Sequence, residues 1–416
     1  MEYDLIVIGA GAAGLMAAGV AARAGRNVLV VEKMEKGGRK VRITGKGRCN
    51  LTNAKPREEF LAKVRSGREF FEYSYDRFDS QRTIDFFRKS GVPIEVERGD
   101  RAFPKSGKAW DIANALVKWA ETNGAKVMYR TSAEDIKVLG GKIYGVGICT
   151  RNGFVRNLEC ANVILATGGA SYPATGSTGD GYPFAHALGH TIEEIRPSLV
   201  PLVSNYPRIG ELDGLHLKNV GARLIIDGEV AREEFGEMDF SERGMEGAVI
   251  LRLSREAVDA LIEGKKVELA LDLKPALDPE TITDRIARER AALPEVARLG
   301  EVVRKLVPKV LVNPICAELG ADSSWRMNKI EEEKFAALVG VLKNFVLPVS
   351  DYKGFEEAVV TAGGVSTYEI DPQTMQSKLV KGLYFAGEVM DIDADTGGYN
   401  LQVAFSTGHL AGELKQ

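Results

Sequence analysis

Cysteine and histidine are both scarce in this sequence of 416 residues, which contains four of each. No two cysteines form a CxxC pair, and no histidine lies two or four residues from a cysteine. This pattern argues against a disulfide framework, and we expect no metal site. Unpaired thiols are typical of a reducing compartment, so we expect a cytoplasmic protein.

Long apolar runs and a charge excess of one sign are also missing. No stretch reaches the roughly 20 consecutive apolar residues that cross a bilayer. The apolar N-terminus, MEYDLIVIGAGAAGL, lacks the basic region of a secretory signal. The net charge of −3 does not favour a general nucleic-acid binder. We therefore expect neither a membrane nor a nucleic acid as a partner.

The N-terminal segment has the alternation of strands and helices that is typical of a parallel α/β sheet. DLIVI predicts a buried strand, AAGLMAAGVAARAG a helix, and NVLVVEK a second buried strand. Between the first strand and the helix, Gly9, Gly11 and Gly14 match GxGxxG, which permits a tight turn, approach of a pyrophosphate and close helix packing. Glu32 ends the second strand, where a carboxylate is expected to accept hydrogen bonds from a ribose.

The segment that follows, KGGRKVRITGKGRCNLTN, gathers four glycines and six cations into residues 36–53. It begins just beyond the carboxyl end of the second strand, the edge where such sheets bind ligands. We predict that its glycines let the backbone wrap a dinucleotide, while Arg39, Lys40 and Arg48 offset the negative charge. A solvated basic loop is the alternative interpretation.

Three later motifs are predicted to reach the same edge. ILATGG ends a core strand on small residues, from Ala166 to Gly169. GLYFAGE predicts a strand that delivers Gly387 and Glu388 to the sheet edge. The segment after it predicts a helix whose first turn lies near Asn400 to Gln402, with its positive end toward the ligand.

The order of predicted strands and helices along the chain indicates a discontinuous α/β domain. Alternating strands and helices fill residues 1–195 and return over 346–416. Residues 196–345 read as an inserted module, first rich in strands and then helical. We predict a Rossmann-like domain interrupted by this insert.

GRKVRITGKGRCNLTN and GLYFAGEVMDIDADTGGYNLQVAFSTG resemble the HI0933-like family (YhiN, BaiN, aminoacetone oxidase) of FAD-dependent oxidoreductases. The resemblance implies FAD, a flavoprotein of the two-dinucleotide-binding-domain type, and an insert that combines a β-barrel-like piece with a helical piece. The wider class usually has Asp where this chain has Glu388. The FAD-binding residues it implies are Gly9, Gly11, Ala12, Ala13, Gly14, Glu32, Lys33, Gly38, Arg39, Lys40, Thr44, Gly45, Arg48, Cys49, Asn50, Ala133, Ala166, Thr167, Gly168, Gly387, Glu388, Asn400, Leu401 and Gln402.

We accordingly expect an enzyme that moves a hydride between flavin N5 and a small-molecule substrate, bound between the ring and the insert. NAD(P)H is a candidate electron donor, although the chain has no second GxGxxG. Arg48 and Tyr399 are candidate catalytic residues, and Gly363 and Gly364 are expected near the ring. Two alternatives stay open: a flavin-binding sensor, and a nucleic-acid-linked flavoprotein whose footprint is the basic segment and VVRKLVPKV.

Overall fold

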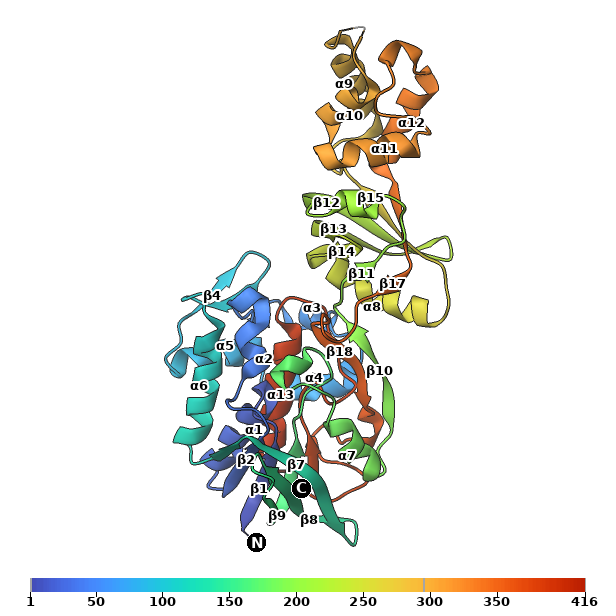
Figure 1. Ribbon diagram of the computed structural model, residues 1–416. Helices are drawn as coiled ribbons and strands as arrows, with labels where there is room; N and C mark the ends of the chain where they lie inside the picture. Colours follow the sequence, from blue (N-terminus) through green and yellow to red (C-terminus); the bar gives the residue numbers. More distant parts are fainter. Residues whose placement is uncertain (1, 295, 416) are drawn as a thin grey trace. The chain divides into compact units, whose positions relative to one another are not determined.

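The computed structural model describes residues 2–294 and 296–415. The chain divides into two compact units, Met1–Pro197 with Phe355–Gln416, and Ser198–Gly354 (Figure 1). The sequence placed the return to the first domain near residue 346. In the structure the return comes later, because β16 (Phe345–Val349) pairs with β15 (Val267–Asp272) in the sheet of the second unit.

The first unit is built on a seven-stranded sheet in the order β6-β2-β1-β9-β8-β7, with β19 also paired to β9. The strands around β1 are parallel, whereas β7, β8 and β9 pair antiparallel. This is the Rossmann-like α/β arrangement expected from the sequence. The strand bounds are β1 Tyr3–Ile8, β2 Val28–Glu32, β6 Lys126–Tyr129, β7 Thr131–Leu139, β8 Lys142–Thr150, β9 Val155–Leu165 and β19 Leu383–Phe385.

Helices and two small sheets complete the first unit. β3 (Thr52–Asn53), β5 (Arg101–Pro104) and β4 (Ile94–Glu97) form one small sheet, and β10 (Ile192–Ser198) pairs with β18 (Val360–Val365) in the other. The helices are α1 Ala12–Arg23, α2 Arg39–Ile43, α3 Arg57–Leu61, α4 Arg68–Arg77, α5 Ser80–Lys89, α6 Ala109–Thr122, α7 Gly181–Ala187 and α13 Tyr399–Gly412. Three 3₁₀ turns are η1 Thr44–Gly47, η2 Pro173–Thr175 and η6 Thr367–Glu369.

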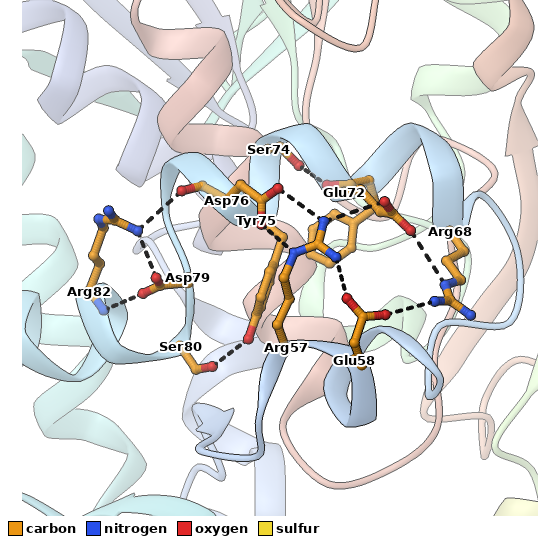
Figure 2. Close-up of polar contacts among 11 residues, drawn as sticks. Arg57, Glu58, Arg68, Glu72, Ser74, Tyr75, Asp76, Asp79, Ser80 and Arg82 are labelled. Atoms are coloured by element: carbon orange, nitrogen blue, oxygen red, sulfur yellow. Dashed lines mark hydrogen bonds and ion pairs between the residues drawn. The ribbon is translucent and has the colours of Figure 1, made fainter.

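Ion pairs join α3 and α4 on the surface of the first unit, and a hydrogen bond from Arg82 to Asp76 O links α5 to them (Figure 2). The Arg57 guanidinium contacts carboxylates on both α3 and α4, including Asp76 Oδ1 at 2.7 Å from Nε. Beneath it, the Tyr75 hydroxyl lies 2.8 Å from Ser80 Oγ. The cations of this surface are thus neutralised locally.

The second unit has its own core and a single seven-stranded sheet in the order β16-β15-β12-β13-β14-β11-β17. Its two end strands, β16 and β17, follow each other directly in the chain. Strand-rich segments come first and most of the helices later. The remaining bounds are β11 Leu202–Val203, β12 His216–Ile226, β13 Glu229–Ser241, β14 Gly244–Glu246, β17 Asp351–Tyr352, α8 Ala248–Ile262, α9 Pro279–Ala291, α10 Leu299–Leu306, α11 Val312–Glu318, α12 Glu332–Lys343, η3 Ile209–Leu212, η4 Lys309–Leu311 and η5 Met327–Lys329.

Candidate functional site

The turn between β1 and α1 needs glycine at three positions, each for a different reason. Gly9 has a φ of 104°, and a Cβ there would lie 2.5 Å from the carbonyl oxygen of Ala166. A Cβ at Gly14 would lie 1.9 Å from the carbonyl oxygen of Gly9, so the helix packs directly on the turn. A Cβ at Gly11 would meet no atom within 4 Å. Gly11 therefore faces open space at the start of α1.

The first turn of α1 presents unpaired backbone donors to that space. The first backbone hydrogen bond of the helix runs from Leu15 N to Gly11 O, at 3.0 Å. Among the described residues, the N–H groups of Ala12, Ala13 and Gly14 have no partner. Three free donors and the positive end of a helix dipole suit a phosphate.

Helix α13 lies side by side with α1 through small residues (Figure 1). A Cβ at Gly408 would lie 2.4 Å from Ala13 O, and one at Gly412 would lie 2.5 Å from Ala17 O. Both contacts advance by four residues in the same direction, so the two helices run parallel. α1 begins one residue before Ala13 and α13 begins nine before Gly408. At 1.5 Å per residue, this eight-residue offset separates the two N-termini by about 12 Å along the axis.

The first turn of α13 forms a second set of donors. Gly398 precedes the helix with a φ of 98°, and Gln402 N donates to Gly398 O at 3.2 Å. Within the described residues, the N–H groups of Tyr399, Asn400 and Leu401 lack a partner. Two positive helix ends, pointing the same way and offset by about 12 Å along the axis, match a ligand that carries a pyrophosphate and, some distance from it, an electron-rich ring.

The carboxylate of Glu32, at the end of β2, accepts hydrogen bonds from the protein backbone without any ligand. Its Oε2 accepts from Ala10 N at 2.7 Å, and its Oε1 accepts from Met34 N at 2.8 Å. Burial raises the pKa of the Glu32 carboxyl, and these two hydrogen bonds oppose the rise. The carboxylate thus shapes the turn itself, and its presence does not by itself distinguish an adenosine ligand.

The cations of residues 36–53 were predicted to offset ligand charge, but the structure pairs three of them with carboxylates. The pairs are Arg39 with Glu35, Lys40 with Glu388 and Arg48 with Glu97. A paired cation contributes little net charge to a ligand. Arg48 is also half-exposed and stacks on Phe103 at 4.3 Å, so its geometry does not support a catalytic role.

The loop from Thr44 to Asn50 adopts an unusual left-handed course. Gly45, Lys46 and Gly47 all have positive φ, as does Cys49. Cys49 is fully buried, and burial raises the pKa of its thiol to about 12, so it stays protonated. Asn50 Oδ1 is buried and has no hydrogen-bond partner within the described chain. An orphaned acceptor of this kind is available to a ligand N–H group.

Thr167 offers a second buried polar atom without a partner among the described residues, its Oγ1. The following Gly168 has a φ of 76°, which turns the backbone at the end of β9. Gly169 packs on Thr361, whose Oγ1 accepts from Ala170 N at 2.9 Å. Thr361 was not singled out from the sequence, because nothing local marks a strand threonine as a loop anchor.

Glu388 joins three segments that are distant in the sequence. Its Oε2 lies 2.8 Å from Lys40 Nζ, and its Oε1 accepts from Thr361 N at 2.8 Å. The preceding Gly387 donates its N–H to Thr407 Oγ1 at 3.0 Å. Glu388 therefore has a structural task at a position where the resemblance implied a contact with FAD.

The side chains of Asn400 and Gln402 form hydrogen bonds within the protein. Asn400 accepts from Ala394 N at 3.0 Å and donates to Ala394 O at 2.8 Å. Gln402 is fully buried, accepts from Thr52 Oγ1 at 2.6 Å and donates to Phe78 O at 2.8 Å. Of the predicted contacts in this turn, the N–H groups of Asn400 and Leu401 are available, whereas Gln402 has neither its side chain nor its N–H free.

Tyr399 and the glycine pair of β18 serve packing. The Tyr399 ring is 4% exposed and meets Phe60 edge-on at 4.8 Å, and burial raises the pKa of its hydroxyl above the usual range. A Cβ at Gly363 would lie 2.0 Å from Glu194 O, and one at Gly364 would lie 2.7 Å from Val389 O. These positions explain the residue types without a catalytic role.

A cavity of about 410 Å³ opens beside the end of β2. It was not foreseen, because its walls come from three separate segments. Ala133, one of the FAD-binding residues that the resemblance implied, pairs with Ile148 and is not among the lining residues. Ser132 and Cys149, one pair along the ladder, do line the cavity. The lining residues are Lys33, Met34, Glu35, Arg130, Ser132, Cys149, Thr150 and Arg151. Lys33 itself forms an ion pair with Asp180.

Within the described residues, no group of three or more His, Cys, Asp or Glu side chains could hold a metal ion. In that same part of the chain, no helix has the length and apolar character of a membrane span. The residues present instead fit FAD, with the pyrophosphate at α1 and the ring at α13. They offer two helix ends with unpaired N–H groups, open space beside Gly11, and two buried side-chain oxygens without a hydrogen-bond partner.

Comparison with known proteins shows the family of this chain. A model of the HI0933-like protein Rossmann domain matches residues 3–414. A 3-dehydro-bile acid delta(4,6)-reductase of Clostridium scindens is 30% identical over 98% of this chain and 97% of that protein. A ribosomal RNA dihydrouridine synthase of Escherichia coli is 31% identical over 98% of this chain and 96% of that protein.

Solved structures show the same fold at low identity. A 3-ketosteroid delta1-dehydrogenase from Sterolibacterium denitrificans superposes with a TM-score of 0.52 at 16% identity, covering 99% of this chain and 98% of that one. A 3-ketosteroid-delta4-(5alpha)-dehydrogenase from Rhodococcus jostii gives a TM-score of 0.50 at 17% identity, covering 100% and 97%.

Proposed function

Because the chain belongs to the HI0933-like family and is an FAD-dependent oxidoreductase, we propose that it reduces a carbon–carbon double bond conjugated to a carbonyl group. Bound FAD would supply the hydride chemistry. The chain's own contribution is the pair of helix ends: α1 for the pyrophosphate, and α13 for the edge of the ring that becomes negative on reduction.

The names of the two full-length relatives carry this proposal. A 3-dehydro-delta(4,6) steroid and a uridine are chemically unlike, but each holds its double bond in conjugation with a ring carbonyl. Such a bond accepts a hydride at the carbon remote from the carbonyl, because the developing charge spreads onto oxygen. A proton then completes the saturated product. Electron-poor alkenes are thus the substrate class that both names share.

The experiment is an anaerobic half-reaction. Protein-bound FAD is reduced with one equivalent of dithionite and mixed with a 3-oxo-4,6-diene steroid, a simple enone, uridine or a saturated ketone. We expect the oxidised flavin absorbance to return with at least one conjugated acceptor and not with the saturated ketone. Reoxidation by none of the conjugated acceptors, or equally by the saturated ketone, would contradict the proposal.

NADH or NADPH is the electron donor that we propose for turnover. The chain offers no second glycine fingerprint, so the donor would share the flavin site rather than occupy a domain of its own. Anaerobic bleaching of the oxidised flavin by each nucleotide tests this. The four cysteines are free thiols, which supports a reducing cytoplasm as the working compartment.

A further inference from the structure

One face of the first unit carries more positive charge than its own carboxylates neutralise. It consists of residues 36–48 and 98–110, and we call it the basic face. Arg57 and Arg68, on α3 and α4 outside this face, each meet carboxylates (Figure 2). On the basic face, six exposed cationic side chains have no carboxylate within ion-pair distance among the described residues: Lys36, Lys46, Arg98, Arg101, Lys105 and Lys108.

The unpaired carboxylates on or beside this face do not cancel the excess. Glu95, Asp100 and Asp111 are the ones that form no ion pair in the described structure. Six cations against three acids leave the face positive, although the chain as a whole has a net charge of −3. The pyrophosphate of FAD does not account for the excess, because it is assigned to the open N–H groups of α1. The positive field is therefore available to a second anion.

A half-exposed tryptophan is fixed at one end of the basic face. Trp110, in the first turn of α6, is 51% exposed, with the Arg42 guanidinium 4.5 Å and Lys36 Nζ 5.0 Å from its ring centre. Arg42 is buried and also donates to Asn114 Oδ1 at 3.0 Å, so it holds the indole from below the surface. Lys108 lies two residues before Trp110 in the chain. An indole fixed in this way can stack a purine base, with two lysines nearby for a phosphate on the same nucleoside.

The other end of the basic face reaches the loop assigned to FAD. The guanidinium groups of Arg48 and Arg101 lie 4.3 and 5.9 Å from the Phe103 ring centre, and a Cβ at Gly45 would lie 3.9 Å from the same ring. Asn50, whose buried Oδ1 has no partner within the described chain, follows in this loop. A ligand that stacks on Trp110 and follows the cations therefore leads toward the flavin.

We propose that the basic face binds NADPH, with the adenine on Trp110, the 2′-phosphate between Lys36 and Lys108, and the nicotinamide at the loop beside the flavin. This inference rests on the proposed function, because it selects the electron donor of that reaction and places it. A hydride passes from C4 of the nicotinamide to oxidised FAD and carries two electrons. NADP⁺ is left, and one proton from solvent completes the reduced flavin.

Charge distinguishes NADPH from NADH on this face. The 2′-phosphate is a phosphate monoester, which carries about −1.5 to −2 charge at pH 7, and NADH lacks it. Lys36 and Lys108 flank the tryptophan without a carboxylate partner among the described residues, so a phosphate beside the stacked adenine would relieve their mutual repulsion.

Stacking also favours a dinucleotide over an acidic protein as the occupant. An acidic protein would use the cations but would leave the exposed indole of Trp110 without a function. Because the chain has no second glycine fingerprint, the donor needs a binding surface beside the flavin rather than a domain of its own. The basic face supplies both the charge and the ring that such a surface requires.

The test measures binding of NADP⁺ and NAD⁺ to the FAD-loaded protein by calorimetry. We expect NADP⁺ to bind at least about tenfold more tightly than NAD⁺, a difference of about 1.4 kcal/mol. The double variant Lys36→Ala, Lys108→Ala should remove this preference and leave the affinity for NAD⁺ nearly unchanged. Trp110→Ala should instead weaken both nucleotides about tenfold, as for removal of one stacked base.

The matched control removes two exposed lysines from the second unit, with Lys305→Ala and Lys309→Ala, and should keep the preference for NADP⁺. Flavin absorbance and the thermal midpoint establish that each variant is folded and loaded. Anaerobic bleaching of the flavin should be faster with NADPH than with NADH in the parent and the control. In the Lys36→Ala, Lys108→Ala variant the two rates should be equal.

Equal affinities for NADP⁺ and NAD⁺ in the parent would overturn the proposal, and so would a preference that survives in the Lys36→Ala, Lys108→Ala variant. Binding of both nucleotides that Trp110→Ala leaves unchanged would remove the adenine from this ring. Heparin that binds tightly to the face where NADP⁺ does not would overturn a dinucleotide as the occupant. The enone half-reaction starts from dithionite-reduced protein and uses no nicotinamide, so the proposed reaction can stand if this inference fails.

Discussion

Gly408 of α13 lies directly on Ala13 of α1, so close that a Cβ at Gly408 would sit 2.4 Å from the Ala13 carbonyl oxygen. The contact fixes how far α13 extends beyond α1, and hence the spacing of the two helix ends. It links a helix that begins at residue 12 to one that ends at residue 412. The spacing of these two ends thus depends on a glycine nine residues into α13.

Gly408→Ala should therefore push the helices apart. We expect a loss of about 1–3 kcal/mol in unfolding free energy, the range for overpacking a tight contact. FAD affinity should fall as well, because the helix ends move relative to each other. Urea denaturation and FAD titration measure the two effects.

Gly340→Ala in α12 is the matched control, because a Cβ there meets no atom within 4 Å. It should stabilise by up to about 1 kcal/mol through helix propensity. Equal effects of the two substitutions would mean that α13 does not pack on α1 as described.

Substitutions at the glycines of the GxGxxG motif should separate effects on FAD affinity from effects on folding stability. Gly11→Ala adds a methyl group to open space at a φ of −81°, so the FAD-free protein should keep its thermal midpoint. The methyl group would obstruct a phosphate, and we expect FAD affinity to fall at least about tenfold, or 1.4 kcal/mol.

Gly14→Ala should behave in the opposite way. Its Cβ would lie 1.9 Å from the Gly9 carbonyl oxygen, so the FAD-free protein itself should be destabilised. Thermal unfolding without FAD and equilibrium FAD titration distinguish the two variants. A Gly11→Ala protein that binds FAD normally would remove the pyrophosphate from the start of α1.

His190 should make the protein sensitive to mild acid. Its ring is 1% exposed, and burial lowers its pKa below 6.5, although Glu369 lies 3.3 Å from Nδ1 and opposes the shift. Below pH 6.5 the unfolded chain takes up a proton that the folded chain refuses, so stability falls as the pH falls toward the lowered pKa of the folded state. The slope is at most about 1.4 kcal/mol per pH unit for one histidine.

His190→Gln should reduce this loss, measured as thermal midpoints at stepwise lower pH with FAD at one saturating concentration. The exposed His186→Gln variant is the control and should retain it. His409 is half-buried, and desolvation lowers its pKa as well, so the reduction should be partial. An unchanged acid sensitivity in His190→Gln would contradict the assignment.

One cysteine should react much faster than the other three. Burial raises the thiol pKa of Cys49 and Cys160 to about 12 and that of Cys316 to about 11. Cys149 is half-exposed and lines the cavity beside β2. A disulfide reagent should therefore label one thiol in the native protein, and Cys149→Ser should abolish the fast phase.

FAD should slow the labelling of Cys149 if the adenosine end occupies that cavity. Labelling rates with and without the cofactor measure this directly. The same rate in both states would place the adenosine elsewhere, and fast labelling of Cys49 would contradict its burial.

The helix predicted near Asn400 is α13, which begins at Tyr399, and Gly398→Val would be a poor probe of what its first turn binds. Gly398→Val would push a side chain to within 2.5 Å of the Thr52 backbone, so it would disturb packing before any redox potential could be compared. The backbone N–H groups of Asn400 and Leu401 are what the helix offers to a ring.

By itself the sequence determined the Rossmann-like order of strands and helices. Buried strands, an alanine-rich helix and turn glycines can each be recognised from local periodicity and residue type. Gly9, Gly11 and Gly14 could be assigned separate tasks because the strand–turn–helix pattern around them is local, but the contact of Gly9 with Ala166 exists only in the folded chain. Only the tertiary structure decided which cationic side chains have a carboxylate partner. Lys40 meets Glu388, 348 residues later, whereas Lys36 and Lys46 meet no carboxylate among the described residues, and no local pattern distinguishes them. Partner choice, burial and the offset of α13 on α1 depend on contacts between distant segments, so they exist only once the chain has folded.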